Sequence, residues 1–236
     1  MKNIALLNLF YALIPLLFVA YIYYKYTNDK KEILYASLRM FVQLLGIGYL
    51  LVYIFSNEDI YLAYFILFFM LCISAIITIR NTQEKNIKHY CIIFLSLALS
   101  CLSILFLIVF IVLELQEYQA SIIIPIAGMI FATAMNTLSI GVERFEKEYE
   151  RTGFRQARNV AFKSCLIPQI NSYLAVGLVA LPGMMTGQIL SGIDPLIAVR
   201  YQIMVMLMLF SSSGLAVILY FFLLHRYKVY NTKSKP

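Results

Sequence analysis

Charge is scarce in this sequence of 236 residues. Asp, Glu, Lys and Arg make up 13% of it, about half of their share in soluble domains, whereas 62% of the residues are hydrophobic. Tryptophan is absent, and there are only two histidines. A chain this apolar lacks the polar residues to cover a soluble fold, and its mean hydropathy of +0.82 is typical of a protein with several membrane helices.

Motifs that carry enzymatic chemistry are also missing. The sequence has no HExxH, no P-loop, no GxGxxG and no Ser-His-Asp arrangement, and His89 and His225 both lie at the ends of predicted spans. The four cysteines form no CxxC pair and lie in or beside apolar runs, so we expect buried free thiols. We therefore expect no enzyme active site, no cofactor bound by this chain, and ATP only on a partner subunit.

The apolar residues fall into seven segments that are long enough to cross a bilayer. They predict an all-α, polytopic membrane protein of the cell (inner) membrane, with residues 1–236 forming one transmembrane domain. The segments are Ile4–Tyr24, Ile33–Phe55, Tyr61–Ile79, Cys91–Leu113, Ala120–Val142, Cys165–Leu190 and Pro195–Leu224.

The basic residues predict the orientation of these spans. Of the 19 Lys and Arg residues, two lie inside spans, only Lys2 lies on one side, and the other sixteen lie in alternate loops and in the C-terminal tail. Basic loops stay in the cytoplasm, so we expect the N-terminus outside and the C-terminus inside. The net charge of +7 forms no stripe on a soluble domain, and we expect no nucleic-acid partner.

The longest hydrophilic stretch, residues 143–164, carries ten charged residues. Apolar residues at helical spacing on both sides of Thr152-Gly153 predict a helix–turn–helix on the cytoplasmic surface. Its six basic residues are typical of an anchor to anionic lipid. The alternative is a coupling element that docks onto a cytoplasmic partner through Glu143, Arg144, Phe145, Tyr149, Phe154, Arg155 and Arg158.

Proline and glycine interrupt the sixth predicted span. Pro182 lacks a backbone N–H and should displace the carbonyl of Leu178, which breaks the helix at membrane depth. Such breaks are tolerated where they line a cavity or a transport path. Gly183, Gly187 and Ser191 form a small-residue stripe that would also fit helix packing. Asp194-Pro195 predicts the N-cap and first residue of the last helix.

Few other polar side chains lie inside the spans. Arg39 and Gln43 share a helix face, and Arg39 either reaches to the headgroups or lines a cavity. Asn136 and Asn171 fit interhelical hydrogen bonds or ligand contact. Five of the ten methionines lie between Met184 and Met208, as core filler or, for Met185, as a metal ligand. The spans contain no Asp or Glu, which favours an anionic, neutral or chelated solute over a bare divalent ion.

The sequence resembles one transporter family in the runs LIPQIN (166–171), VGLV (176–179), LPGMMTGQIL (181–190) and YQ (201–202). Weaker matches upstream include Arg39, Gln43, Asn136 and Glu143-Arg144. These runs are similar to the permease subunit of FetAB-type iron-export ABC transporters, a family with plant relatives tied to aluminium tolerance. The resemblance implies a cytoplasmic ATPase partner, a homodimer of the permease, and export of iron or a related solute.

Combining the resemblance with the polar residues, we predict the residues of a substrate path. They are Pro182, Gly183, Met184, Met185, Gln188, Arg200, Tyr201, Gln202, Arg39, Gln43, Asn136 and Asn171. The interval between Glu143-Arg144 and Leu166 lacks the Leu-Ala-Leu-Gly-Ala run that members of the family carry. Either the shortened hairpin docks the ATPase, or the chain is an ATP-independent channel or interaction subunit.

Overall fold

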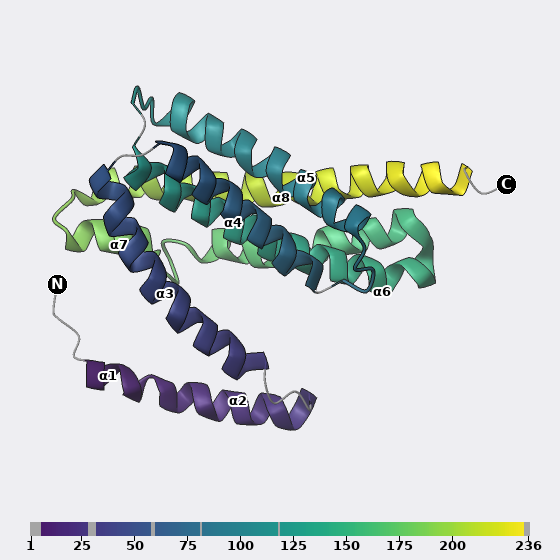
Figure 1. The fold of residues 1–236 in the computed structure, drawn as a ribbon, viewed down its shortest axis with the longest axis horizontal. Coiled ribbons are helices and arrows are strands. Elements are labelled where there is room, and N and C mark those ends of the chain that lie inside the picture. The colour runs from purple at the N-terminus through teal and green to yellow at the C-terminus, as the bar shows by residue number, and fades with distance from the viewer. Residues whose placement is uncertain (1–5, 28–31, 58–59, 81, 118, 234–236) are drawn as a thin grey trace. The chain divides into compact units, whose positions relative to one another are not determined.

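The computed structural model describes residues 6–27, 32–57, 60–80, 82–117 and 119–233, and every regular element in them is helical (Figure 1). The predicted all-α class is therefore confirmed. The elements are α1 (Leu6–Tyr11), α2 (Leu13–Thr27), α3 (Glu32–Asn57), α4 (Ile60–Arg80), α5 (Ile87–Phe106), the π-helix η1 (Leu107–Val112), α6 (Ala120–Ala175), α7 (Gly183–Leu190) and α8 (Pro195–Lys233). They form two compact units, residues 1–58 and 59–236.

The N-terminal unit contains α1, α2 and α3. The predicted first span is divided into two helices, because Pro15 in the first turn of α2 cannot share a helix with the carbonyl of Tyr11, where α1 ends. Ile4, at the start of that predicted span, and the loop residues Lys30 and Lys31 lie outside the described residues. The 26-residue α3 matches the predicted second span.

Within the described residues, five helices are long and apolar enough to cross a membrane, against seven predicted spans. They are α3, α4, α5 with η1, α6 and α8. The 56-residue α6 contains one predicted span and the start of another, and α2 is only 15 residues long. The chain is therefore a multi-pass membrane protein, and the count of seven and the orientation stay predictions.

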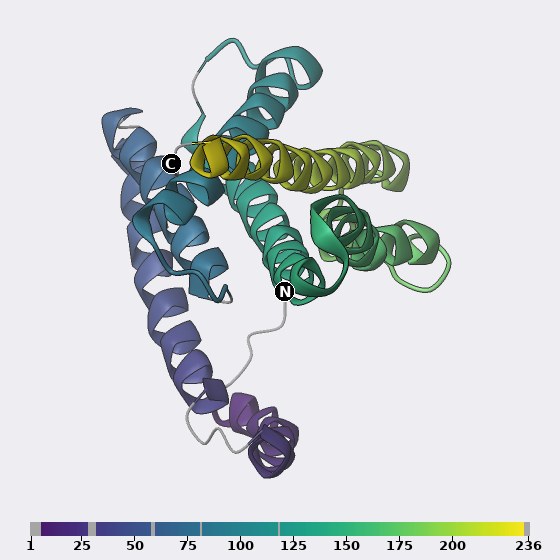
Figure 2. The same cartoon turned by 90° about the vertical axis from the view of Figure 1, so that its right-hand side faces the viewer.

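The larger unit is built from α4, α5, α6 and α8, which pack against one another (Figures 1 and 2). Small residues allow close packing inside a bilayer, where apolar surface alone provides little attraction between helices. A Cβ atom at Gly141 would lie 3.4 Å from the Cys165 sulfur, so the two halves of α6 approach closely there. The Ser100 hydroxyl donates to the Ser212 carbonyl at 2.6 Å and joins α5 to α8.

The chain reverses inside α6 at Gly153, where the sequence predicts a helix stop. Gly153 has φ 76° and ψ 173°, a backbone conformation that is essentially restricted to glycine. The residues before and after it form two long antiparallel arms (Figure 1). The predicted helix–turn–helix is therefore the tip of two long helices rather than a separate pair of surface helices.

The predicted break lies in the sixth span, but its cause differs from the prediction. Helix α6 ends at Ala175, and Gly177 follows with φ 81°. The N–H groups of residues 178, 179 and 180 all turn back to the Ala175 carbonyl, at 3.2, 2.8 and 3.2 Å. The chain has thus left the helix before Pro182, which is the N-cap residue of α7 and displaces no carbonyl of Leu178.

Two smaller predictions about this region have different outcomes. Nothing lies within 4 Å of a Cβ atom built at Gly183 or Gly187, so among the described residues the small-residue stripe brings no other helix close. The N-cap of the last helix is confirmed, because the Asp194 carboxylate accepts a hydrogen bond from the N–H of Leu196 at 2.7 Å. Pro195 is the first residue of α8.

The backbone conformation at the α6 turn predicts that alanine changes the stability of the protein differently at Gly153 and at Gly214. Gly153→Ala should destabilise the protein by about 1–3 kcal/mol, because alanine rarely adopts this conformation. Gly214→Ala, inside α8, should be neutral or stabilise by up to about 1 kcal/mol, since alanine is the better helix former. Neither site has an atom within 4 Å of the added Cβ atom. Thermal unfolding in detergent measures both; equal losses would contradict the assigned backbone strain.

Candidate functional site

A groove of about 360 Å³ lies where α6 ends, and we call it the break groove. It is lined by the end of α6, the segment that follows, α7 and α8, and its walls are mostly apolar. Pro182, Met185 and Gln202, three of the predicted path residues, line it together with Tyr173 and Met206. The Tyr173 hydroxyl donates to the Met206 carbonyl at 2.9 Å and holds α8 against the end of α6.

Gln202 is the most unusual residue in the break groove. Its side chain is 6% exposed, and its Oε1 atom is buried with no hydrogen-bond partner among the described residues. A buried amide oxygen without a donor costs about 1–3 kcal/mol. Gln202 thus places an amide oxygen that is unpaired within the described residues in the mostly apolar lining that also contains Met185 and Met206.

The other predicted path residues do not line this groove. On α7, Met184 packs against the hydrophobic core, and the Gln188 Oε1 atom is buried without a partner. Arg200 and Tyr201 are exposed at the start of α8, Gly183 is exposed on α7, and Asn136 and Asn171 are exposed on the two arms of α6. Arg39 and Gln43 lie one turn apart on α3, in the N-terminal unit.

Eight of the lining residues were not predicted, among them Tyr173 and Met206. Met206 follows Gln202 by four residues and so shares its helix face, which is a signal that the sequence does contain. Tyr173 has no comparable signal, because it contacts α8 through a residue 33 positions away in the sequence.

The predicted coupling residues divide into an inner and an outer set. Phe145 is 1% exposed, and its ring centre lies 5.4, 5.3 and 5.2 Å from those of Tyr149, Phe154 and Phe221. Glu143, Arg144, Arg155 and Arg158 are exposed. The aromatic residues thus join the two arms of α6 to α8, while the charged residues form the outer surface of the hairpin.

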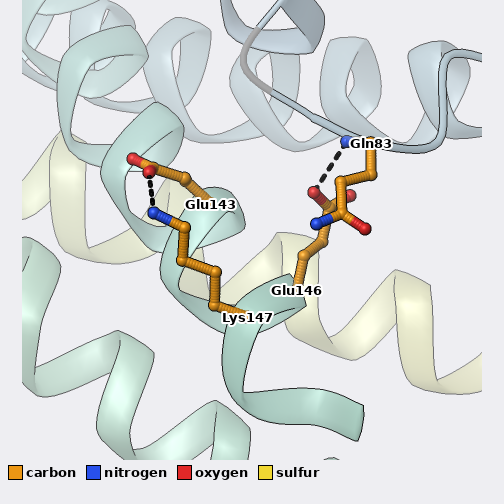
Figure 3. A network of polar contacts seen from close by, with 4 residues as sticks. All are labelled: Gln83, Glu143, Glu146 and Lys147. Carbon is orange, nitrogen blue, oxygen red and sulfur yellow. Dashed lines mark hydrogen bonds and ion pairs between the residues drawn. The ribbon is translucent and has the colours of Figure 1, made fainter. Parts of the chain in front are cut away.

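Polar contacts hold this hairpin to its neighbours. The carboxylate of Glu146 accepts a hydrogen bond from the backbone N–H of Gln83 at 2.8 Å, which ties the segment between α4 and α5 to α6 (Figure 3). His89 bridges the Tyr220 hydroxyl and the Glu84 carbonyl, both at 2.8 Å. The outer pair, Lys147 with Glu143 at 2.6 Å, is exposed and contributes little to stability (Figure 3).

The apolar helices, the broken span and the charged helical hairpin define the class of multi-pass, all-helical membrane proteins. The model of an uncharacterised protein family, UPF0014, matches residues 4–153 and 149–228, and the chain belongs to this family. The two matched segments meet at the Gly153 turn. A chain that lacks residues of the family's loop at this point would match in this way.

Several relatives are similar over most of their length. The "Probable iron export permease protein FetB" of Escherichia coli is 34% identical over 224 residues, covering 87% of this chain and 84% of the relative. The "UPF0014 membrane protein slr1647" of Synechocystis is 30% identical, covering 85% and 84%. The Arabidopsis thaliana "Protein ALUMINUM SENSITIVE 3" is 30% identical, covering 77% and 71%. No solved structure matches this chain.

The burial of Phe145 predicts that it acts through packing. Phe145→Ala should destabilise the protein by about 3–5 kcal/mol, the usual loss for a large aromatic residue in a core. Arg155→Ala, on the exposed side of the same hairpin, should change stability by less than about 0.5 kcal/mol. Thermal unfolding in detergent compares the two variants. A small effect of Phe145→Ala would show that this side chain is not a core residue.

Proposed function

We propose that this chain is the permease subunit of an ABC transporter that exports iron or a related metal or small solute across the cell (inner) membrane. ATP binds and is hydrolysed on a separate cytoplasmic ATPase, and two copies of the permease form the core. The observation that carries the proposal is family membership, with a relative named as an iron export permease that aligns over 84% of its length.

The break groove supports a path through the larger unit. Irregular backbone at membrane depth is tolerated where it is buried in protein or lines a cavity, and four residues of the segment after Ala175, namely Val176, Gly177, Leu181 and Pro182, line this groove. Its lining contains two methionines and one glutamine but no carboxylate. That chemistry suits a neutral or chelated solute, with Met185 as the one predicted metal ligand.

Helix α8 provides a physical link between the groove and the hairpin. Gln202 lines the groove, and Phe221, 19 residues later on the same helix, contacts Phe145 of the hairpin. At 1.5 Å per residue the two positions are about 28 Å apart. An ATPase that moves the hairpin would therefore move α8 at the groove without any intermediate loop.

ATP dependence tests the proposal directly. Inside-out vesicles that contain this chain and the ATPase that co-purifies with it should take up iron when ATP is added. Vesicles with a non-hydrolysable ATP analogue should not. Uptake that is indifferent to ATP, with no ATPase in the purified complex, would contradict the proposal.

The shortened hairpin favours a second candidate, an ATP-independent channel or interaction subunit. In that case the exposed charged residues of the hairpin, Glu143, Arg144, Arg155 and Arg158, could be replaced together by neutral glutamine without loss of flux. The ABC permease should lose both ATPase binding and flux with the same replacement. The measurement is iron uptake into the same vesicles, with protein level and folding checked in parallel.

Two buried polar groups without partners allow a matched test of the groove. Gln202→Leu and Ser213→Ala each remove such a group, and each should leave stability unchanged or raise it by about 1 kcal/mol. Of these two residues Gln202 alone lines the break groove, so Gln202→Leu alone should reduce transport, by about tenfold for one lost hydrogen bond of ~1.4 kcal/mol. Equal transport by the two variants would remove Gln202 from the path.

A further inference from the structure

A second and larger groove lies between the second arm of α6 and the C-terminal half of α8, and we call it the hairpin groove. Its volume is about 680 Å³, and it is separate from the break groove. Its lining includes Arg158 and Phe162 on α6, and Ile218, Phe222, His225 and Arg226 on α8.

The hairpin groove is charged at one end and apolar at the other. The ring of Phe154, next to the turn, lies 4.7 Å from that of His225, which sets the two antiparallel helices in register. Ile218 therefore lies level with Phe162, at the end away from the turn. From Ile218 to Arg226 the chain rises by about 12 Å, so the groove changes from apolar to cationic over that length.

The charge in this groove is of one sign. Its lining contains two arginines and a histidine but no Asp or Glu. Arg226 lies over the Phe222 ring, 4.9 Å from its centre, and Arg158 donates two N–H groups to the Asn159 side chain, at 3.3 and 3.2 Å. Among the described residues neither arginine has a carboxylate within ion-pair distance. Planar guanidinium groups held in this way match the oxygens of a phosphate.

The apolar end distinguishes an amphiphile from a soluble anion. Ile218 and Phe222 are 50% and 53% exposed, and both lie in a helix that is apolar enough to cross a membrane. Their exposed faces would therefore border the acyl chains. Arg226 lies next to the end of the span at Tyr227, where headgroups would begin, and by the register above Arg158 lies level with Phe221, about one turn deeper. A soluble phosphate would leave half of the groove uncovered.

From these observations we propose that the hairpin groove binds one anionic phospholipid. The phosphate contacts Arg158 and Arg226, and an acyl chain lies along Phe162, Ile218 and Phe222. The lipid would join the hairpin to α8. Binding of this lipid depends on the lining of the hairpin groove and requires neither the proposed substrate nor an ATPase.

Because the sequence contains no tryptophan, the fluorescence of one introduced tryptophan reports on the hairpin groove alone. Phe222→Trp introduces the sole tryptophan of the chain at the groove, and Ile218→Trp is a second reporter if the first variant does not fold. Each is reconstituted in phosphatidylcholine vesicles that contain a minor fraction of brominated phosphatidylglycerol or brominated phosphatidylcholine. Quenching by the bromine atoms reports which lipid occupies the groove.

Brominated phosphatidylglycerol should quench with at least about fivefold higher apparent affinity than brominated phosphatidylcholine, since a basic residue near an anionic lipid contributes about 1 kcal/mol. The reporter Phe106→Trp, on an exposed face of α5, should show no such preference. Equal quenching by the two lipids at the groove would overturn the proposal.

Two double variants that remove the same charge at different places show which arginines cause the preference for phosphatidylglycerol. Arg158→Gln with Arg226→Gln should abolish it, whereas Arg151→Gln with Arg155→Gln removes the same charge from exposed residues outside the lining and should retain it. Equal loss in both double variants would mean general surface charge and would contradict a groove site. Excess inorganic phosphate should not reduce quenching; if it does, the site takes a free anion and the lipid proposal fails.

Discussion

Every backbone N–H and C=O inside a bilayer must find a partner within the protein, and this constraint determines the architecture of the chain. Helices satisfy it throughout α3, α4, α5, α6 and α8. After Ala175 the regular helical pattern ends, but three N–H groups still find a partner by sharing one carbonyl as the chain turns out of the helix. The break groove lies at this point, so the place where regular pairing ends is also the place where a solute could be accommodated.

The sequence predicts most helix positions, because a long apolar run that crosses a membrane forms a helix, which pairs its backbone N–H and C=O groups within the segment. The number of separate spans is harder to predict, since it depends on local breaks. Pro15 divides the first predicted span, and Gly153 joins two arms into one element. From the sequence, Pro182 is the expected cause of the break in the sixth span. Proline limits where a helix can continue, however, and here the helix ends before Pro182 is reached. The earlier departure at Gly177 requires a positive φ, which composition does not reveal.

The candidate site was predictable in part. Pro182, Met185 and Gln202 belong to specific motifs, and they meet in one groove. Tyr201 and Arg200 precede Gln202 by one and two residues but do not line the groove, because successive residues on a helix point about 100° apart. Phe145 was predicted on the charged hairpin as a docking residue, yet the arm carries it into the core. Sequence reveals which residues are unusual, and tertiary packing determines which of them face one another.

The reversal at Gly153 has a consequence for how this hairpin tolerates changes of length. Phe145 and Phe154 lie on opposite arms and meet only because the turn sets their rotational phase. One residue added to or removed from the segment between them, residues 146–153, would rotate one arm by about 100° relative to the other and separate the two rings. The core contact between the arms therefore restricts the length of the tip, although the tip carries exposed charged residues.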